Sequence, residues 1–213
     1  MNTYPKVDCY FYKGHPDLSQ SEFLEDKTLW IKISESLDTV YEKTLRAFEY
    51  FVPKLDEYDF VYRSNLSTFV SFQHMLEFCA ELPTTNCCAA FAGCVPENGN
   101  SLDYEMSFPG GNGFLLSTDL VRRLVEEKPP LNGQDDVTIG DALRRWKVPI
   151  IGFVRPDFRD DGFWYMNNFH LLKSNERNLR PKKNMFSYRL KSFDRAKDIS
   201  TMEELVRGVY GIV

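Results

Sequence analysis

Residues 37–63 read LDTVYEKTLRAFEYFVPKLDEYDFVYR, and this stretch decides the fold class. Its first part, residues 37–55, repeats apolar side chains at the three- and four-residue spacing of an amphipathic helix. The remainder, residues 58–63, is rich in aromatic and β-branched residues and predicts a strand. The apolar positions of the expected helix are Leu37, Val40, Tyr41, Leu45, Phe48, Phe51 and Val52.

Two apolar segments precede this helix. Residues 7–12 (VDCYFY) predict a first, buried strand, and residues 30–33 predict a second, short one. A strand, a helix and a further strand in succession are typical of a parallel sheet. The sequence therefore predicts an α/β protein with a central, mixed but mostly parallel sheet flanked by helices.

The rest of the chain continues the same alternation and contains no repeat and no linker, so we expect one domain over residues 1–213. Residues 109–113 (PGGNG) carry three glycines and predict a loop that lets the backbone approach a ligand closely. The other expected elements are helices over 69–82, 119–127, from 135 onward and 202–209, and strands over 87–95, 102–108, 114–117 and 149–154.

Composition excludes several classes of protein. Hydrophobic residues make up 43% and charged residues 27%, which is usual for a soluble globular chain of 213 residues. A net charge of −5 disfavours general binding to nucleic acid or to an anionic membrane. No segment predicts a signal peptide or a membrane span. Five cysteines without a C-x-x-C pair predict neither disulfides nor a zinc site, so we expect a cytoplasmic protein.

Polar residues follow the predicted strand 58–63 directly. Residues 62–68 read YRSNLST, and the carboxyl end of such a strand is where open α/β sheets place ligand crevices. The alternative is structural: Ser64, Asn65 and Ser67 form a turn and cap the next helix.

Two adjacent carboxylates open the helix expected from residue 135, where the sequence reads DDVTIG. A helix N-terminus stabilises negative charge, so capping accounts for one of them. The other is a candidate general base, because it follows a flexible segment and comes soon after the glycine segment.

The region near the C-terminus is locally cationic. His170 is a candidate metal ligand only if oxygen donors lie beside it. A solvated surface is the simplest interpretation of the lysines and arginines that follow, and a diphosphate or an acidic partner is the alternative. These residues are Lys173, Arg177, Arg180, Lys182, Lys183, Arg189, Lys191 and Arg195, set against Glu176 and Asp194.

The order of these segments resembles the GT-A nucleotide-sugar glycosyltransferases, especially the β1,3-galactosyltransferase and Fringe-like group. The similarity spans residues 37–171 and is carried by residues 58–70 (YDFVYRSNLSTFV), 111–120 (GNGFLLSTDL), 135–140 (DDVTIG) and His170. The whole chain is also similar to the N-terminal glycosyltransferase domain of larger viral proteins that build capsid glycans. That similarity implies the host-cell cytoplasm, and further domains if the chain is part of a longer protein.

The resemblance implies an enzyme that moves a sugar from a UDP-sugar to a hydroxyl of a glycan or glycoprotein acceptor, with Mn²⁺ or Mg²⁺ assisting the departure of UDP. It implies Asp136 as the base, with Asp135 as the alternative, and Asn65, Ser67 and His170 as metal ligands. Residues implied to contact the nucleotide or its sugar are Cys9, Tyr10, Phe11, Lys13, Arg63, Ser64, Gly111, Asn112, Gly113 and Lys173.

One departure from the family concerns the metal. The positions of its usual acidic triplet hold Asn65, Leu66 and Ser67, and divalent cations of this kind prefer charged oxygens. Either the diphosphate brings the ion with it, or another acid substitutes for the missing carboxylates. Candidates for that acid are Asp59, Asp103 and Glu105.

Two other classes of function compete with this interpretation. A chain that kept the fold and lost the metal site would be a catalytically silent nucleotide- or glycan-binding module. An unrelated α/β enzyme such as a hydrolase is the second, but the sequence contains neither a G-x-S-x-G elbow nor a G-x-x-x-x-G-K-[ST] loop.

Overall fold

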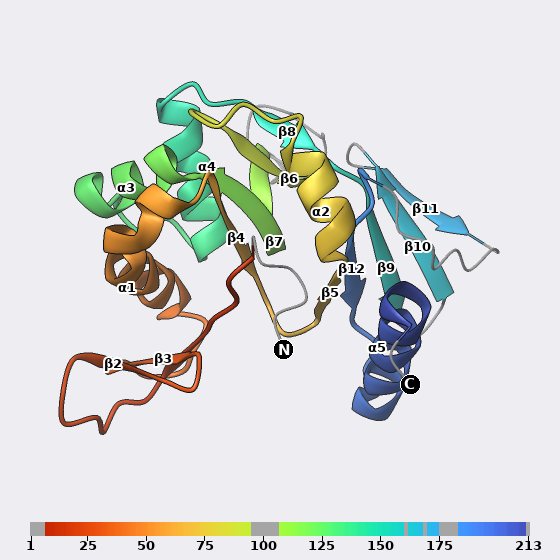
Figure 1. Cartoon of the computed structure of the whole chain (residues 1–213), viewed down its shortest axis with the longest axis horizontal. Helices are drawn as coiled ribbons and strands as arrows, with labels where there is room; N and C mark the ends of the chain where they lie inside the picture. Colours follow the sequence, from red (N-terminus) through yellow and green to blue (C-terminus); the bar gives the residue numbers. More distant parts are fainter. Residues whose placement is uncertain (1–6, 95–106, 160–161, 168–169, 175–182, 212–213) are drawn as a thin grey trace. The chain divides into compact units, whose positions relative to one another are not determined.

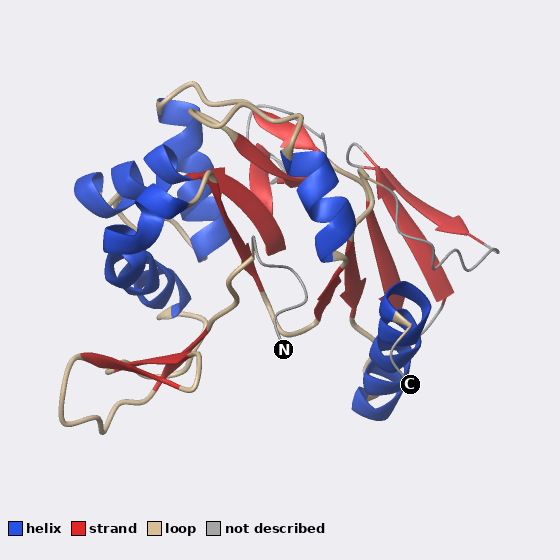
Figure 2. Ribbon diagram, viewed as in Figure 1, coloured by secondary structure: helices blue, strands red, loops and turns tan. Residues whose placement is uncertain are grey.

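The structure, a computed structural model, describes residues 7–94, 107–159, 162–167, 170–174 and 183–211, and describes side chains outside 92–107 and 159–182. These parts form a mixed α/β protein with five α-helices and three sheets (Figure 2). The chain divides into two compact units. The first comprises Met1–Val61, Pro83–Cys87 and Leu116–Pro149, and the second comprises Tyr62–Leu82, Cys88–Leu115 and Ile150–Val213.

A three-stranded sheet opens the first unit (Figure 1). Strands β1 (Phe11–Gly14), β3 (Thr28–Ile31) and β2 (Glu22–Glu25) lie side by side in that order, with β1 parallel and β2 antiparallel to β3. One face of this sheet packs against α1 (Val40–Phe51). The contact is built from Leu29, Ile31 and Ala47, all buried.

The first strand differs from its prediction in extent and in burial. It begins at Phe11, four residues later than expected, and the Phe11 side chain is 58% exposed. Side chains alternate between the two faces of a strand, and only one face of this sheet is covered by α1. The expectation of a fully buried strand over residues 7–12 is therefore wrong.

The helices of the first unit pack around a shared apolar core. Helix α1 contacts both α3 (Thr118–Glu127) and α4 (Asp135–Arg145). The helix predicted over residues 37–55 is confirmed in its centre, but Pro53 has no N–H to donate and the chain continues as the 3₁₀-helix η1 (Val52–Glu57). The buried side chains are Tyr41, Phe48, Leu120, Val121, Leu124, Ile139 and Leu143.

The second unit contains the other two sheets. One has the order β4 (Phe60–Ser64), β7 (Ser107–Ser117), β6 (Cys88–Cys94) and β8 (Ile150–Gly152), with β6 parallel to β8; the first residues of β4 and the last of β7 belong to the first unit. The other has the order β11 (His170–Ser174), β10 (Gly162–Asn167), β9 (Arg155–Arg159), β12 (Ser187–Leu190) and β5 (Thr68–Val70).

Two helices accompany these sheets, α2 (Phe72–Cys79) and α5 (Arg195–Tyr210). Phe69, Tyr188 and Leu190 pack against Leu205 of α5 and form one core cluster. The helix expected over residues 69–82 begins only at Phe72, because residues 68–70 pair with β12 as a short strand. None of the helices that the structure describes combines the length and the apolar character needed to cross a bilayer.

The predicted α/β class is confirmed, but its predicted arrangement is not. The described residues form three small sheets in place of one central sheet, and neighbouring strands in the five-stranded sheet are antiparallel except for β9 and β12. The strand predicted over 102–108 lies almost entirely outside the described residues. A single domain over residues 1–213 stays a prediction.

The side chain of Ser117 makes a buried hydrogen bond whose contribution to stability can be tested. Ser117 occupies the N-cap position of α3, but its buried hydroxyl accepts a hydrogen bond from Cys87 N at 2.9 Å instead of capping the helix. Ser117→Ala leaves that buried N–H without its side-chain partner, and we expect a loss of about 1–3 kcal/mol of unfolding free energy. Urea unfolding measures it, with the more exposed Thr118→Ala as control. An unchanged urea midpoint would show that this bond carries no stability.

Candidate functional site

The loop after β4 is held by a single side chain. The Asn65 Oδ1 atom accepts hydrogen bonds from Ser67 N at 3.2 Å, Ser67 Oγ at 2.8 Å and Thr68 Oγ1 at 3.0 Å. An asparagine that bonds to the backbone two residues onward makes an Asx turn. The prediction that Asn65 and Ser67 take part in a turn is therefore confirmed. The prediction that these residues cap the next helix is wrong, because the short strand β5 follows the turn and Ser71 occupies the N-cap position of α2.

This loop lies against the glycine-containing segment of β7, and the hydrogen-bonded residues are 44 or more positions apart in the sequence. Asn65 N donates to the Asn112 carbonyl at 3.4 Å, and Thr68 Oγ1 donates to the same carbonyl at 2.7 Å. The buried Arg63 guanidinium donates to the Gly111 carbonyl. Five residues predicted to be in the site, Arg63, Asn65, Ser67, Gly111 and Asn112, are thus brought together in the second unit, and Ser64 adjoins them.

The glycines of residues 109–113 do not form a loop, contrary to expectation, because this segment lies inside β7. The Tyr62 ring occupies the space that a Gly113 side chain would need, and the Phe91 carbonyl lies 2.9 Å from where a Gly110 Cβ would be. The close backbone approach is therefore made to neighbouring protein groups. Loss of solvent around the Tyr62 hydroxyl raises its pKa to about 12, although Ser187 bonds to it at 3.0 Å.

A buried ion pair completes this cluster and was not predicted. Arg155 and Asp157 are 3% and 1% exposed and form a bidentate pair, with Nε–Oδ1 at 2.6 Å and Nη2–Oδ2 at 3.2 Å. Arg155 also donates to Asn112 Oδ1 and lies 4.2 Å from the centre of the Phe91 ring. The two charges lie two residues apart, which places both side chains on one face of β9, but the strand reads RPDFR and no motif singles out this pair from the charges around it.

The side-chain amide of Asn112 has a hydrogen-bond donor that is available to a ligand. Its Nδ2 atom is buried and has no hydrogen-bond partner among the residues that the structure describes, while its Oδ1 atom accepts from Arg155. A buried amide donor without a partner costs free energy unless water or a ligand accepts its proton. This N–H is therefore a candidate donor to an oxygen atom of a ligand.

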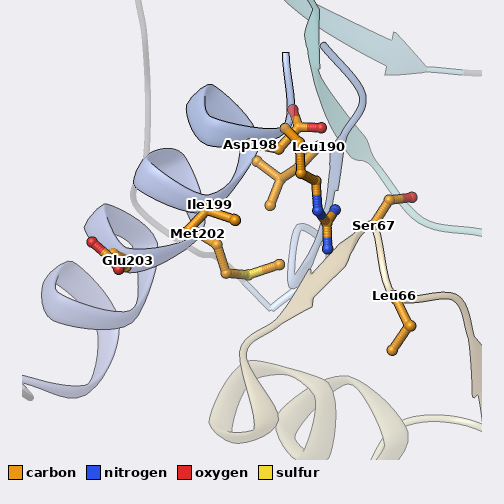
Figure 3. Close-up of a pocket in the computed structure, with 8 residues that line it drawn as sticks. Leu66, Ser67, Leu190, Asp198, Ile199, Met202 and Glu203 are labelled. Atoms are coloured by element: carbon orange, nitrogen blue, oxygen red, sulfur yellow. The ribbon is translucent and has the colours of Figure 1, made fainter. Parts of the chain in front are cut away.

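A small pocket is lined in part by Leu66 and Ser67 of the same loop (Figure 3). It has a volume of about 130 Å³, and Ile199 and Met202 project into it from α5. Leu66, at the tip of the loop, is 72% exposed at its edge. The remaining lining residues are Ser67, Leu190, Arg195, Asp198 and Glu203.

The loop alone does not provide the ligands that Mn²⁺ or Mg²⁺ prefers. Asn65 and Ser67 offer neutral oxygens, and Asn65 Oδ1 already accepts three hydrogen bonds. No group of three or more His, Cys, Asp or Glu side chains suited to a metal occurs within the described parts of the chain. Of the substitute acids, Asp59 belongs to the first unit, and Asp103 and Glu105 lie outside the described residues.

The C-terminal candidates are described mainly through their backbone. His170 and Lys173 lie in β11, opposite Asn167 and Trp164 of β10, and their side chains lie outside the described residues. Part of the cationic region is neutralised within the unit. Lys183 pairs with Glu81, and Arg189 Nη1 lies 3.9 Å from Asp157 Oδ2.

The two candidate bases occupy different environments at the start of α4, in the first unit. Asp135 is 3% exposed and accepts a hydrogen bond from Thr44 Oγ1 at 3.1 Å, and that hydroxyl also lies 3.1 Å from the Tyr12 hydroxyl. Asp136 is only partly buried, and its Oδ1 accepts from Val137 N at 2.9 Å, in the first turn of the helix. Asp136 is thus the more accessible carboxylate.

The N-terminal candidates also lie in the first unit, around β1. Cys9 is exposed, and Tyr10 packs on Phe51 with ring centres 4.6 Å apart. Phe11 and Lys13 lie on the sheet face that α1 does not cover, where Lys13 Nζ lies 5.2 Å from the centre of the Trp30 ring.

No protein-family model matches the chain, and no curated protein matches it.

Proposed function

We propose that the chain is a UDP-sugar-dependent glycosyltransferase that moves a sugar to a hydroxyl group of a glycan or glycoprotein. One observation carries the proposal. The loop Ser64–Thr68 and the β7 segment Gly111–Gly113 are hydrogen-bonded to each other although they lie far apart in sequence. The resemblance to GT-A enzymes assigns Asn65 and Ser67 of the loop to the metal, and Ser64 and the β7 segment to the donor nucleotide and its sugar. A GT-A fold is part of the same proposal.

The residues of the second unit would hold the donor. The buried Asn112 Nδ2 offers an N–H to a ligand oxygen, and Arg63 fixes the Gly111 carbonyl beside it. Guanidinium groups in this cluster favour a ligand that carries negative charge, such as a diphosphate. Mn²⁺ or Mg²⁺ would enter with the nucleotide, whose diphosphate supplies the anionic oxygens that the loop lacks.

Asp136 would act as the general base in an inverting transfer. Its carboxylate takes the proton of the acceptor hydroxyl while the oxygen forms its bond to the anomeric carbon. The bond between that carbon and the diphosphate breaks in the same step, and UDP departs with the electron pair. Asp135 accepts a hydrogen bond from Thr44 Oγ1 and would position the start of α4 through it.

Release of UDP tests the proposal. The purified chain is incubated with UDP-glucose, UDP-galactose, UDP-N-acetylglucosamine and, as control, GDP-mannose, with mixed glycans as acceptors and with Mn²⁺ present or absent. We expect UDP release from at least one UDP-sugar, faster than GDP release from GDP-mannose. No release above the buffer rate from any donor would contradict an enzymatic function.

The neutral loop favours one alternative, a catalytically silent module that binds a nucleotide or a glycan. Asn65 Oδ1 is already fully used within the loop, and no carboxylate replaces the acidic triplet there. This alternative predicts UDP or glycan binding without any UDP release.

A further inference from the structure

The open face of the β1–β3–β2 sheet carries a row of aromatic side chains. Cross-strand partners share a face, and the register pairs Lys13 with Trp30 and Trp30 with Phe23. The next row on this face contains Phe11 opposite Thr28. Tyr12, Leu29 and Leu24 form the row between them and lie on the opposite face, which packs on α1.

This aromatic face is not required by the core of the sheet. Leu29 and Ile31 are fully buried on the covered face, whereas Phe11 is 58% exposed and Lys13 is also exposed. Phe23 and Trp30 are only partly buried. A cluster of large aromatic side chains on an exposed face is typical of an interaction site.

The aromatic rings of this face contact one another. The Phe23 and Trp30 rings are nearly parallel, at 18°, with centres 6.4 Å apart. His15 meets the Trp30 ring edge-on at 6.2 Å, and Lys13 Nζ lies 5.2 Å from its centre.

We propose that this face, defined by Phe11, Lys13, Phe23 and Trp30, is a carbohydrate-binding surface. The apolar C–H face of a sugar ring packs on an aromatic ring, and its hydroxyl groups both donate and accept hydrogen bonds. Lys13 supplies a donor, and Glu25 of β2 supplies an acceptor on the same face. Binding here does not depend on the proposed transferase function.

The charge on this face favours a carbohydrate over a nucleic acid as the ligand. Lys13 and Glu25 carry opposite charges and cancel on this face, and the chain as a whole has a net charge of −5. Surfaces that bind single strands combine aromatic rings with an excess of positive charge that tracks the phosphates. A hydroxylated ligand of low charge fits these residues better.

The chain offers a direct reporter, because it contains only three tryptophans and hence three indole N–H signals. The full chain is titrated with hexasaccharides of glucose, mannose, xylose, galactose and N-acetylglucosamine, and the Trp30 signal is identified with Trp30→Phe. We expect at least one hexasaccharide to shift the Trp30 signal selectively. Trp30→Ala should weaken its binding about tenfold or more. Trp146→Phe, at the end of α4, is the matched control and should bind normally.

Three further outcomes would overturn the proposal. The first is that no hexasaccharide shifts the Trp30 signal. The second is that UDP or a ten-nucleotide dT strand shifts it and the hexasaccharides do not. The third is that the chain self-associates as its concentration rises and that this association alters the Trp30 signal. UDP release, measured separately, reports on the proposed transferase function. Failure of one proposal is therefore distinguishable from failure of the other.

Discussion

Replacing Asp136 by asparagine is expected to slow sugar transfer by about two to four orders of magnitude while leaving the affinity for UDP unchanged. Asparagine keeps the size of the side chain and its hydrogen bond from Val137 N, but it cannot accept the proton of the acceptor hydroxyl. The rate of UDP release in the presence of acceptor and the dissociation constant of UDP measure the two effects.

Two companion variants sharpen this test. Asp141→Asn changes a carboxylate on the same helix that pairs with Arg144, and it should leave transfer unaltered. Asp135→Asn retains an oxygen that accepts from Thr44 Oγ1, so its effect should be smaller than that of Asp136→Asn. Normal transfer in Asp136→Asn would remove the assignment of the base, and a loss confined to Asp135→Asn would move that assignment to Asp135.

Replacing Asp157 by alanine is expected to cost about 3–5 kcal/mol of unfolding free energy, because it leaves the buried Arg155 guanidinium without its carboxylate. For a chain of this length each kilocalorie corresponds to about 2–4 °C in Tm. Thermal and urea unfolding followed by circular dichroism give both quantities.

The double variant Arg155→Met, Asp157→Leu separates the ion pair from general damage. Removing both charges leaves no unpaired charge at the buried positions 155 and 157, and only the partly exposed Arg189 loses a partner, so the double variant should be more stable than Asp157→Ala alone. Glu203→Ala breaks the exposed pair with Arg207 and should cost about 0–1 kcal/mol. If Asp157→Ala unfolds at the wild-type urea concentration, the ion pair within β9 does not stabilise the fold.

The apolar pattern of the sequence predicted those helices and strands that depend mainly on their own residues. Helix α3 and strand β6 were expected almost where they lie, because each buries a regular set of apolar side chains. The glycine segment of β7 was misassigned, since local sequence favours a loop and only Tyr62 and Phe91, distant in sequence, explain why glycine is needed in a strand. The three sheets were likewise unpredictable, because strand order depends on pairing between remote segments.

The candidate site was predicted in part for the same reason. Asn65, Gly111 and Asn112 were identified through a pattern of segments, and the structure brings them into contact. Arg155 and Asp157 were missed because no motif marks them, although they are the most buried charges in the cluster. The sequence left Asp135 and Asp136 as alternatives, and only burial and the bond to Thr44 distinguish them.

Calorimetric titration of the chain with UDP, with GDP and CMP as controls and with Mn²⁺ present or absent, tests the central claim most directly. The account predicts that UDP binds in the presence of Mn²⁺ and that GDP and CMP do not bind measurably at the same concentrations. Absence of UDP binding under every condition would contradict the assignment of a nucleotide-sugar site to this chain.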